Sequence, residues 1–430
     1  LVMALSTYDS LLGTRDLFYR DYRFAEVFIR LTRAPEAITA RLAEIPGVER
    51  VETRVVAVVK LDVEGFTDPI TGVLSSLPDT GQPLLNTLHL KRGRWVAPYS
   101  GDEVIVSDTF ADAHGLHPGD RIHAVINGRR KALTLVGVAV SPEYVYEIAP
   151  GAMFPDFKRY GVLWMARHAL AAAYDMDGAF NNASLTLGPG TDEQAVIDRL
   201  DTLFGRYGGI GAYGRKDQFS NRFLSEELKQ LQTTATLFPS IFLGVAAFLL
   251  NVVVTRLIAT QREQIAILKA FGYRPVAIGW HYLKLVLLVA GVGVAGGVAL
   301  GVWFGKGLAG VYMELYRFPY LDYVLNPGVV AIALVVAAFA ATTGTLLAVA
   351  RAVRLTPAES MRPATPVAYR ATVLERLGLQ RLLSQPTRMI LRHIERRPLK
   401  SLLTVFGIAC AGGLMMVGNY QRGAIDFMVD

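Results

Sequence analysis

Residues 285–305 read LVLLVAGVGVAGGVALGVWFG, a run without a single charged side chain. A helix needs about 20 residues to cross the hydrocarbon core of a bilayer, so this run is long enough to span it. Charge-free stretches of comparable length occur at residues 230–255, 323–350 and 401–421. A soluble protein rarely leaves four such stretches uncharged. The sequence therefore predicts an α-helical membrane protein with at least four crossings.

Charged residues are concentrated ahead of these stretches, in residues 15–229. The chain as a whole is 52% hydrophobic and 19% charged, whereas soluble proteins carry about 25% charged residues. Its single cysteine, Cys410, lies in the last apolar stretch, which excludes a disulfide within the chain. The formal net charge of +7 depends largely on the loops between crossings, so we predict no nucleic-acid partner.

The distribution of basic residues predicts the orientation in the membrane. Residues 256–284 hold five basic residues and one acidic residue, and residues 306–322 hold two of each. The segment from Arg351 to Arg397 has ten arginines and three acidic residues. Cytoplasmic loops are enriched in Lys and Arg, so the first and third loops are predicted to be cytoplasmic. We therefore expect a multi-pass protein of the plasma (inner) membrane, with its large domain extracytoplasmic.

Residues 15–229 are predicted to form an α+β domain. A strand at 27–31, a helix that starts near Pro35 and a strand at 51–61 make one βαβ-like unit. A second such unit begins with a strand at 183–187, followed by a helix with a capping box of Thr191 and Gln194. Between the two lies a β-rich subdomain with a hairpin at Asn127-Gly128, flanked by strands at 121–126 and 131–140. The fold class is therefore a helical membrane protein plus split βαβ units with an inserted β-rich subdomain.

Catalytic chemistry has little support in this domain. Three histidines and three aspartates raise the possibility of a metal site, but no pair has the spacing of a closed site, and solvated turns explain them better. The residues concerned are His114, His117, His123, Asp108, Asp112 and Asp120. We expect no metal, no cofactor and no catalytic residues, and hence a binding or force-transmitting module rather than an enzyme.

A helical pattern at residues 218–232 runs without Pro or Gly into the first complete crossing, where Pro239 lies one turn inside. We expect one helix that joins the outer domain to the membrane; a short separate helix at the membrane surface is the alternative. In the second crossing Gly293, Gly297, Gly301 and Gly305 recur every four residues and therefore share a helix face. Such a ladder predicts close helix packing, with a partner in this chain or in another.

The cytoplasmic loop at residues 259–278 predicts a short amphipathic helix. Glu263 and Gln264 lie near its start, Ile265, Leu268 and Phe271 offer an apolar face, and Gly272 ends it. A helix of this kind suits a groove on a partner protein. The alternative is a helix that lies on the lipid headgroups.

This loop, REQIAILKAFG at 262–272, resembles the coupling segment of the FtsX-like permease family, which includes the MacB and lipoprotein-releasing (Lol) exporters. RAVRLTPAESMR at 351–362 is similar to the ending of the family's permease unit, and the outer domain resembles the MacB-type periplasmic domain. The resemblance implies docking on a cytoplasmic ABC ATPase dimer, which is a separate subunit because this chain has no Walker A sequence. It implies the coupling residues Arg262, Glu263, Gln264, Ile265, Leu268, Lys269, Phe271 and Gly272. Membrane lipids and a periplasmic adaptor are the other expected partners.

The resemblance also organises the rest of the chain. Residues 1–14 read as the end of a preceding crossing, and 230–362 as a permease unit with three transmembrane helices. Residues 363–400 read as a basic cytoplasmic linker with an elbow helix at 388–397, followed by a further crossing at 401–421. This arrangement is similar to the long family members with two permease units, so we expect both ends to continue into further chain.

Two functions follow from the resemblance. The first is a permease subunit that couples ATP hydrolysis to the export or extraction of a hydrophobic substrate, such as a lipid, lipoprotein or drug-like molecule. The alternative is a non-transporting relay of the FtsX type that regulates an extracytoplasmic enzyme. The predicted crossings contain no charge, so an ion path is not indicated.

Overall fold

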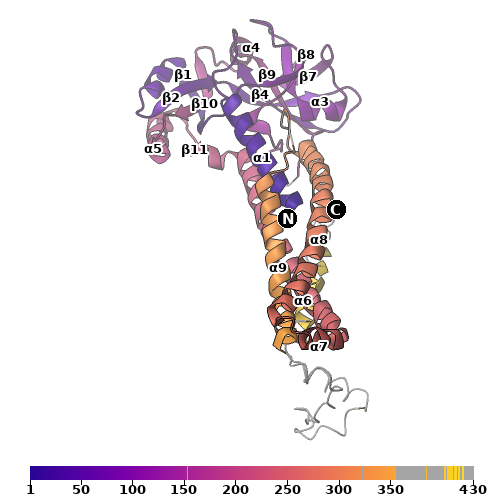
Figure 1. Ribbon diagram of the computed structural model, residues 1–430. Helices are drawn as coiled ribbons and strands as arrows, with labels where there is room; N and C mark the ends of the chain where they lie inside the picture. Colours follow the sequence, from indigo (N-terminus) through magenta and orange to yellow (C-terminus); the bar gives the residue numbers. More distant parts are fainter. Residues whose placement is uncertain are drawn as a thin grey trace. The chain divides into compact units, whose positions relative to one another are not determined.

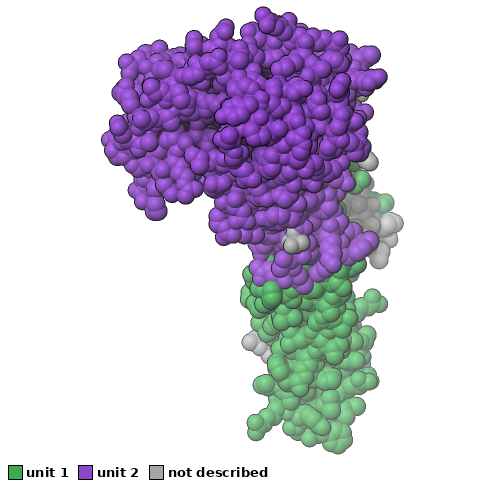
Figure 2. Space-filling model, turned by 90° about the horizontal axis from the view of Figure 1, so that it is seen from above, with its two compact units in different colours: residues 1–2, 234–301, 327–430 green, residues 3–233, 302–326 purple. Residues whose placement is uncertain are grey.

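A computed structural model describes residues 1–152, 154–321, 323–354 and 384, and short stretches between 401 and 420. The chain divides into two compact units, coloured separately in Figure 2. The helical unit comprises residues 1–2, 234–301 and 327–430, and the sheet unit comprises residues 3–233 and 302–326. The sheet unit therefore includes more than the predicted domain at 15–229, because it also takes in the connection after the second long helix.

The two predicted βαβ-like units come together in one antiparallel sheet with the strand order β11-β1-β10-β2. Its strands are β1 (Val27–Pro35), β2 (Val48–Arg54), β10 (Ala179–Leu187) and β11 (Ala212–Gly214). Helices α2 (Thr39–Ala43) and α5 (Glu193–Phe204) pack on it, and their Leu42 and Leu200 are fully buried with Phe180 of β10. We call this part of the sheet unit the sheet lobe (Figure 1).

The β-rich middle forms a second lobe, which is a closed barrel. Its ring of strands is β3-β4-β9-β6-β8-β7, because β7 pairs with both β3 and β8, while β5 adds to the far half of β8. The strands are β3 (Val56–Asp62), β4 (Ile70–Leu77), β5 (His89–Gly93), β6 (Glu103–Ser107), β7 (Arg121–Ile126), β8 (Arg129–Val140) and β9 (Tyr160–Ala166). Side chains alternate between two faces of this sheet. One face joins Leu74, Leu135 and Leu163 with Phe110 of α3 (Asp108–His114) and Leu170 of α4 (Arg167–Ala173) in a common core.

The predicted hairpin is confirmed, since β7 and β8 pair around Asn127 and Gly128, both of which have positive φ. Two local predictions are wrong. The strand expected at 51–61 is two strands, because β2 pairs with β10 in the sheet lobe and β3 pairs with β4 in the barrel. The helix α5 is capped by Asp192, which accepts hydrogen bonds from the amides of Gln194 and Ala195, rather than by Thr191. A carboxylate one residue closer to the first turn takes the place of the expected capping box.

Two long helices belong to both units. The helix α6 (Phe219–Thr260) is continuous through Pro239, as the single joining helix predicted, and α8 (Pro275–Leu315) likewise extends beyond its charge-free stretch. The short helix α7 (Arg262–Ala270) lies between them in sequence, and α9 (Pro327–Arg354) follows. Among the described residues, three helices are long and apolar enough to cross a membrane: α6, α8 and residues 327–346 of α9.

The ends of the chain leave several predictions open. Residues 1–14 fall largely within α1 (Val2–Asp21), which the structure places mostly in the sheet unit. Helical residues occur in the predicted crossing at 401–421, but that stretch is described only in part. The elbow helix at 388–397 and nearly all of the linker lie outside the described residues.

Among the glycines of the helical unit, a close approach to another helix occurs at Gly344 and not at Gly293 or Gly297 of the predicted ladder. A Cβ built on Gly344 of α9 would lie 2.4 Å from the carbonyl oxygen of Ala247 in α6. The positions of Gly293 and Gly297 have no neighbour within 4 Å of such a Cβ, and Gly305 meets only the ring of Tyr323. Within the described residues, Gly293 and Gly297 therefore make no close contact with another helix. The packing role of the glycine ladder stays a prediction.

Gly344→Ala is expected to destabilise the helical unit, because the added methyl group overlaps backbone that cannot rotate away. Overpacking of this kind costs about 1–3 kcal/mol. The midpoint of thermal unfolding of the full chain in one detergent should fall for Gly344→Ala and stay unchanged for Gly293→Ala, which meets open space. Equal midpoints for the two variants would contradict the α6–α9 contact.

Candidate functional site

The short helix α7 is fixed to the helical unit through one of its faces. Ile265 is buried in a cluster with Val254 and Ile258 of α6, Tyr282 of α8 and Ala341 of α9. Beside this cluster, the Tyr282 hydroxyl donates a hydrogen bond of 2.7 Å to Oε1 of Gln261, the residue before α7. The helix ends as predicted: Gly272 has φ +89°, and the amide of Tyr273 bonds to the carbonyl of Leu268. A movement of α7 would therefore carry three long helices with it.

The opposite face of α7 is exposed and largely apolar. Of the predicted coupling residues, Glu263, Gln264, Leu268, Phe271 and Gly272 are exposed, and the residue Phe271 keeps 80% of its accessible surface. Ile267, which was not predicted, lies on this face as well. The predicted apolar face is thus divided, because Ile265 is buried in the bundle. Arg262 and Lys269, three residues before and four residues after Ile265, lie on the same side of the helix and are half-buried. The period of 3.6 residues separates positions 262, 265 and 269 from positions 264, 268 and 271.

A second feature of interest is the connection between α8 and α9, at residues 316–326, which is anchored within the sheet unit. The Arg317 amide donates to the carbonyl of Val145 at 2.9 Å. Phe318 is fully buried with its ring edge-on to Phe18 of α1, and the Val324 amide donates to the Ser10 hydroxyl of α1 at 3.0 Å. This segment was read only as a loop in the sequence. Its contacts with α1 and the barrel join residues about 300 positions apart, as with Ser10 and Val324, and no local pattern reports such contacts.

The side chain of Arg317 reaches the start of α3 in the barrel. Its guanidinium lies 3.2 Å from Asp108 and 3.4 Å from Asp112, and Lys91 approaches Asp108 at 2.8 Å from β5. Two of the carboxylates that had suggested a metal site are thus paired with cations. Asp120 accepts a hydrogen bond from the His117 amide. The described residues contain no group of three or more potential ligands arranged to hold a metal ion.

Next to this ion cluster lies a buried carboxylate, Glu147. It accepts hydrogen bonds from the hydroxyls of Ser107, at 2.8 Å, and Thr109. Burial raises the pKa of the Glu147 carboxyl to about 7, although these two hydrogen bonds, an amide bond from Val162 and the charge of Arg317 act in the opposite direction. Near neutral pH, Glu147 is therefore protonated in about half of the folded molecules.

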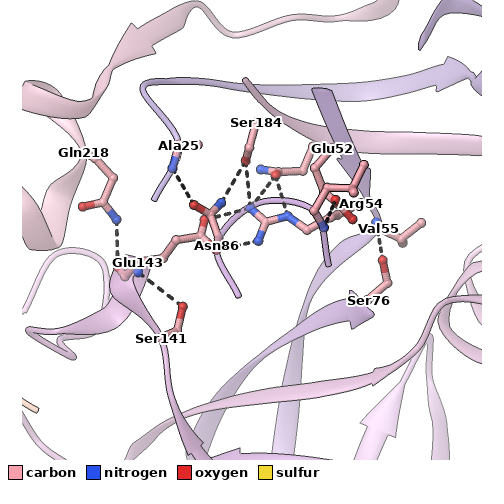
Figure 3. A network of polar contacts seen from close by, with 12 residues as sticks. Ala25, Glu52, Arg54, Val55, Ser76, Asn86, Ser141, Glu143, Ser184 and Gln218 are labelled. Atoms are coloured by element: carbon pink, nitrogen blue, oxygen red, sulfur yellow. Dashed lines mark hydrogen bonds and ion pairs between the residues drawn. The ribbon is translucent and has the colours of Figure 1, made fainter. Parts of the chain in front are cut away.

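The two lobes of the sheet unit and the start of α6 are joined by a buried polar network (Figure 3). Arg54, from the end of β2, binds Glu143 through two hydrogen bonds of 2.5 and 2.7 Å and also reaches Asn182 and Ser184 of β10. The backbone carbonyl of Glu143 accepts a hydrogen bond of 2.8 Å from the Gln218 side chain. Gln218 in turn accepts from the Asn221 amide and so caps α6.

The described residues thus combine long apolar helices, a short exposed helix that follows the first of them in sequence, and an α+β unit. Residues 236–357 match the family described as FtsX-like permease C-terminal. This part of the chain therefore resembles the permease segment of that family.

A curated relative supports this placement. The chain is 23% identical over 264 residues to the uncharacterized ABC transporter permease protein Rv0987 of Mycobacterium tuberculosis, a match that covers 60% of this chain. The chain spans 29% of the length of that relative.

Among solved structures, the periplasmic region of MacB from Actinobacillus actinomycetemcomitans is similar at 10% identity and a TM-score of 0.30, over 49% of this chain and 95% of that one. The extracellular domain of the transporter YknZ from Gram-positive bacteria is similar at 13% identity and a TM-score of 0.28, over 44% and 98%.

Breaking the Arg54–Glu143 pair is expected to destabilise the sheet unit strongly. Arg54→Met leaves a buried carboxylate without its partner, which costs about 3–5 kcal/mol. The double variant Arg54→Met with Glu143→Leu should recover much of this loss, because neither charge is then buried. Arg130→Met is the control: its pair with Asp62 is exposed and should contribute about 1 kcal/mol or less. The thermal unfolding midpoint should fall most for Arg54→Met, less for the double variant and least for Arg130→Met. A midpoint for Arg54→Met equal to that of Arg130→Met would contradict the network.

The stability of the sheet unit should fall with rising pH because of Glu147. Its pKa of about 7 exceeds the ordinary value of 4.5, so folding favours the protonated form. The stabilisation is complete below pH 4.5 and is lost as the pH rises through about 7, by an amount on the order of 3 kcal/mol. Glu147→Gln, which cannot ionise, should show a flatter dependence of the unfolding midpoint on pH between 5 and 8. Exposed Glu44→Gln serves as the control, and a Glu147→Gln profile as steep as that of the unaltered chain would refute the assignment.

Proposed function

We propose that this permease couples a cytoplasmic ABC ATPase dimer to the sheet unit, for export or extraction of a hydrophobic substrate. The ATPase is a separate subunit, and this chain supplies no catalytic residue. The observation that carries the proposal is the division of α7 into two faces. One face is packed among α6, α8 and α9, and the other presents apolar side chains to a partner. An element that receives a force must have both.

The outer face of α7 has the composition of a docking helix. Ile267, Leu268 and Phe271 supply the apolar contact, and Glu263 at the first turn supplies a charge that can fix the register. Exposed Tyr273 and Val276 extend the apolar surface toward α8. Aromatic side chains that enter a partner's groove carry much of the binding energy in interfaces of this type.

The basic loops support an orientation with α7 in the cytoplasm and the sheet unit outside it, because cytoplasmic loops are enriched in Lys and Arg. In this orientation, α8 begins five residues after α7 and ends two residues before Arg317. A helix carries an axial displacement along its length, so movement of α7 would pass through the turn at residues 271–274 into α8 and along α8 toward Arg317 and the Asp108 ion cluster. The same parts would serve a relay that regulates an extracytoplasmic enzyme, and substrate flux into vesicles separates the two activities.

Substitution of the outer face should release the ATPase without unfolding the chain. In mild detergent, Phe271→Asp and Leu268→Asp are expected to lower the recovery of a co-purifying protein with an ATP-binding-cassette sequence by at least about tenfold. Ile210→Asp is the matched control, because this residue is 78% exposed and lies in the sheet unit. Undiminished recovery with Phe271→Asp, or an equal loss with Ile210→Asp, would rule out α7 as the docking element.

A further inference from the structure

The sheet unit contains a cleft of about 450 Å³ between its two lobes. One wall comes from β1, β10 and β11 of the sheet lobe, and the other from β3, β4, β9 and the segment at 143–151. The buried pair of Arg54 and Glu143 lies at this cleft, beside the first residues of α6. The volume falls within the range of about 300–1,000 Å³ that small-molecule sites occupy.

One cation in the cleft has no counter-ion. Arg54 and Glu143 neutralise each other, whereas exposed Arg30 of β1 forms no ion pair among the described residues. The remaining charge of the cleft lining is therefore positive. A guanidinium with free donors is a typical partner for a carboxylate or a phosphate.

Three tyrosines line the cleft together with this arginine. Burial raises the pKa of Tyr144, Tyr160 and Tyr213, and the positive charge of Arg30 lowers it in part; of the three hydroxyls, that of Tyr213 also forms a hydrogen bond with Arg30. Tyr160 is 96% buried, with a relative exposure of 4%, yet it lines the cleft. In the described part of the chain, the hydroxyls of Tyr144 and Tyr160 make no hydrogen bond, and neither is sealed away from the cleft. A carboxylate or phosphate in the cleft would accept hydrogen bonds from these hydroxyls.

The rest of the cleft lining is apolar. Val56, Val58 and Val73 come from the outer face of the barrel, and Ile148 and Phe219 from the segment and helix beside it. Val58 keeps 69% of its accessible surface, so this wall is not covered by the protein itself. An anion alone would leave it in water, and an uncharged apolar molecule would leave Arg30 and the tyrosine hydroxyls without partners.

We propose that the cleft binds an amphipathic anion, with a carboxylate or phosphate headgroup at Arg30 and the tyrosine hydroxyls, and a single acyl chain against Val56, Val58 and Ile148. The inference deepens the proposed function, because it names the class of molecule that the sheet unit handles. Its test uses no ATPase, so its outcome is independent of whether α7 docks one.

The test is photolabelling of the full chain in nanodiscs of phosphatidylcholine. A diazirine derivative of tetradecanoate should label peptides that contain Val58 and Ile148, as mapped by mass spectrometry. Tetradecanoate and tetradecyl phosphate should both compete. Arg30→Gln should lower this labelling at least about tenfold, because it removes a charge-assisted contact. Val58→Glu should lower the labelling as well, because it puts a negative charge on the exposed wall, where it repels the anionic probe.

The controls separate this site from simpler ones. Arg33→Gln removes an exposed arginine of the same strand that does not line the cleft, and should leave the labelling unchanged. Competition by inorganic phosphate alone would reduce the cleft to a simple anion site, and equal competition by tetradecyltrimethylammonium would reduce it to an apolar groove. Either of these two competition results would overturn the proposal. It would also be overturned by absence of label from the cleft peptides, or by equal losses of label for Arg30→Gln and Arg33→Gln.

Discussion

Hydrocarbon offers a backbone amide no hydrogen-bond partner, and the rest of this chain depends on that constraint. Each crossing has to satisfy its own backbone, so α6 and α8 cannot contain a loop within the membrane. Both helices then continue beyond their charge-free stretches, to Phe219 at one end of α6 and to Leu315 at one end of α8. Residues 219–233 of α6 and 302–315 of α8 belong to the sheet unit, so at these two points the chain passes between the units as helix.

The short helix α7 depends on the same helices in a different way. Nine residues would rarely form a stable helix alone in water, so its stability comes from burial of Ile265 and Ala266 in the bundle. The exposed residues Leu268 and Phe271 contribute nothing to that burial. Their presence in water is a cost to solubility that the fold does not require, and an interface explains it.

The sequence predicted the parts of this structure whose causes are local. Absence of charge over a bilayer's width identified the long helices, and Asn127-Gly128 identified the hairpin. Where two causes competed, prediction was less complete. Residues 51–61 form one apolar run, but the pairing partners of Arg54 and Val56 belong to different sheets. The ion pairs of Arg317 with Asp108 and Asp112, and the position of Arg30 in the cleft, were not predicted, because each depends on groups that only the tertiary fold brings together. At α7 the composition was predicted correctly and the face was not, since Ile265 is apolar for the bundle and Leu268 is apolar on the outside.

The two arginines of the interlobe cleft differ in their ion pairing: Arg54 has a counter-ion, and Arg30 has none among the described residues. Arg54 is neutralised by Glu143, and such a buried pair is weak evidence for stability, because removing two charges from water costs about as much as their attraction returns. The geometric effect of the Arg54–Glu143 pair is clearer. Glu143 holds Arg54 through its carboxylate and Gln218, the capping residue of α6, through its carbonyl. The floor of the cleft is therefore one hydrogen bond away from a helix that continues into the helical unit. A ligand can shift a conformational equilibrium only through contacts that differ between the two states. A headgroup held by Arg30 beside Tyr144, the residue that follows Glu143, would lie where a small change in the separation of the lobes alters the contacts of α6. The unpaired arginine would then sense the ligand, and the paired one would connect the ligand to the helix.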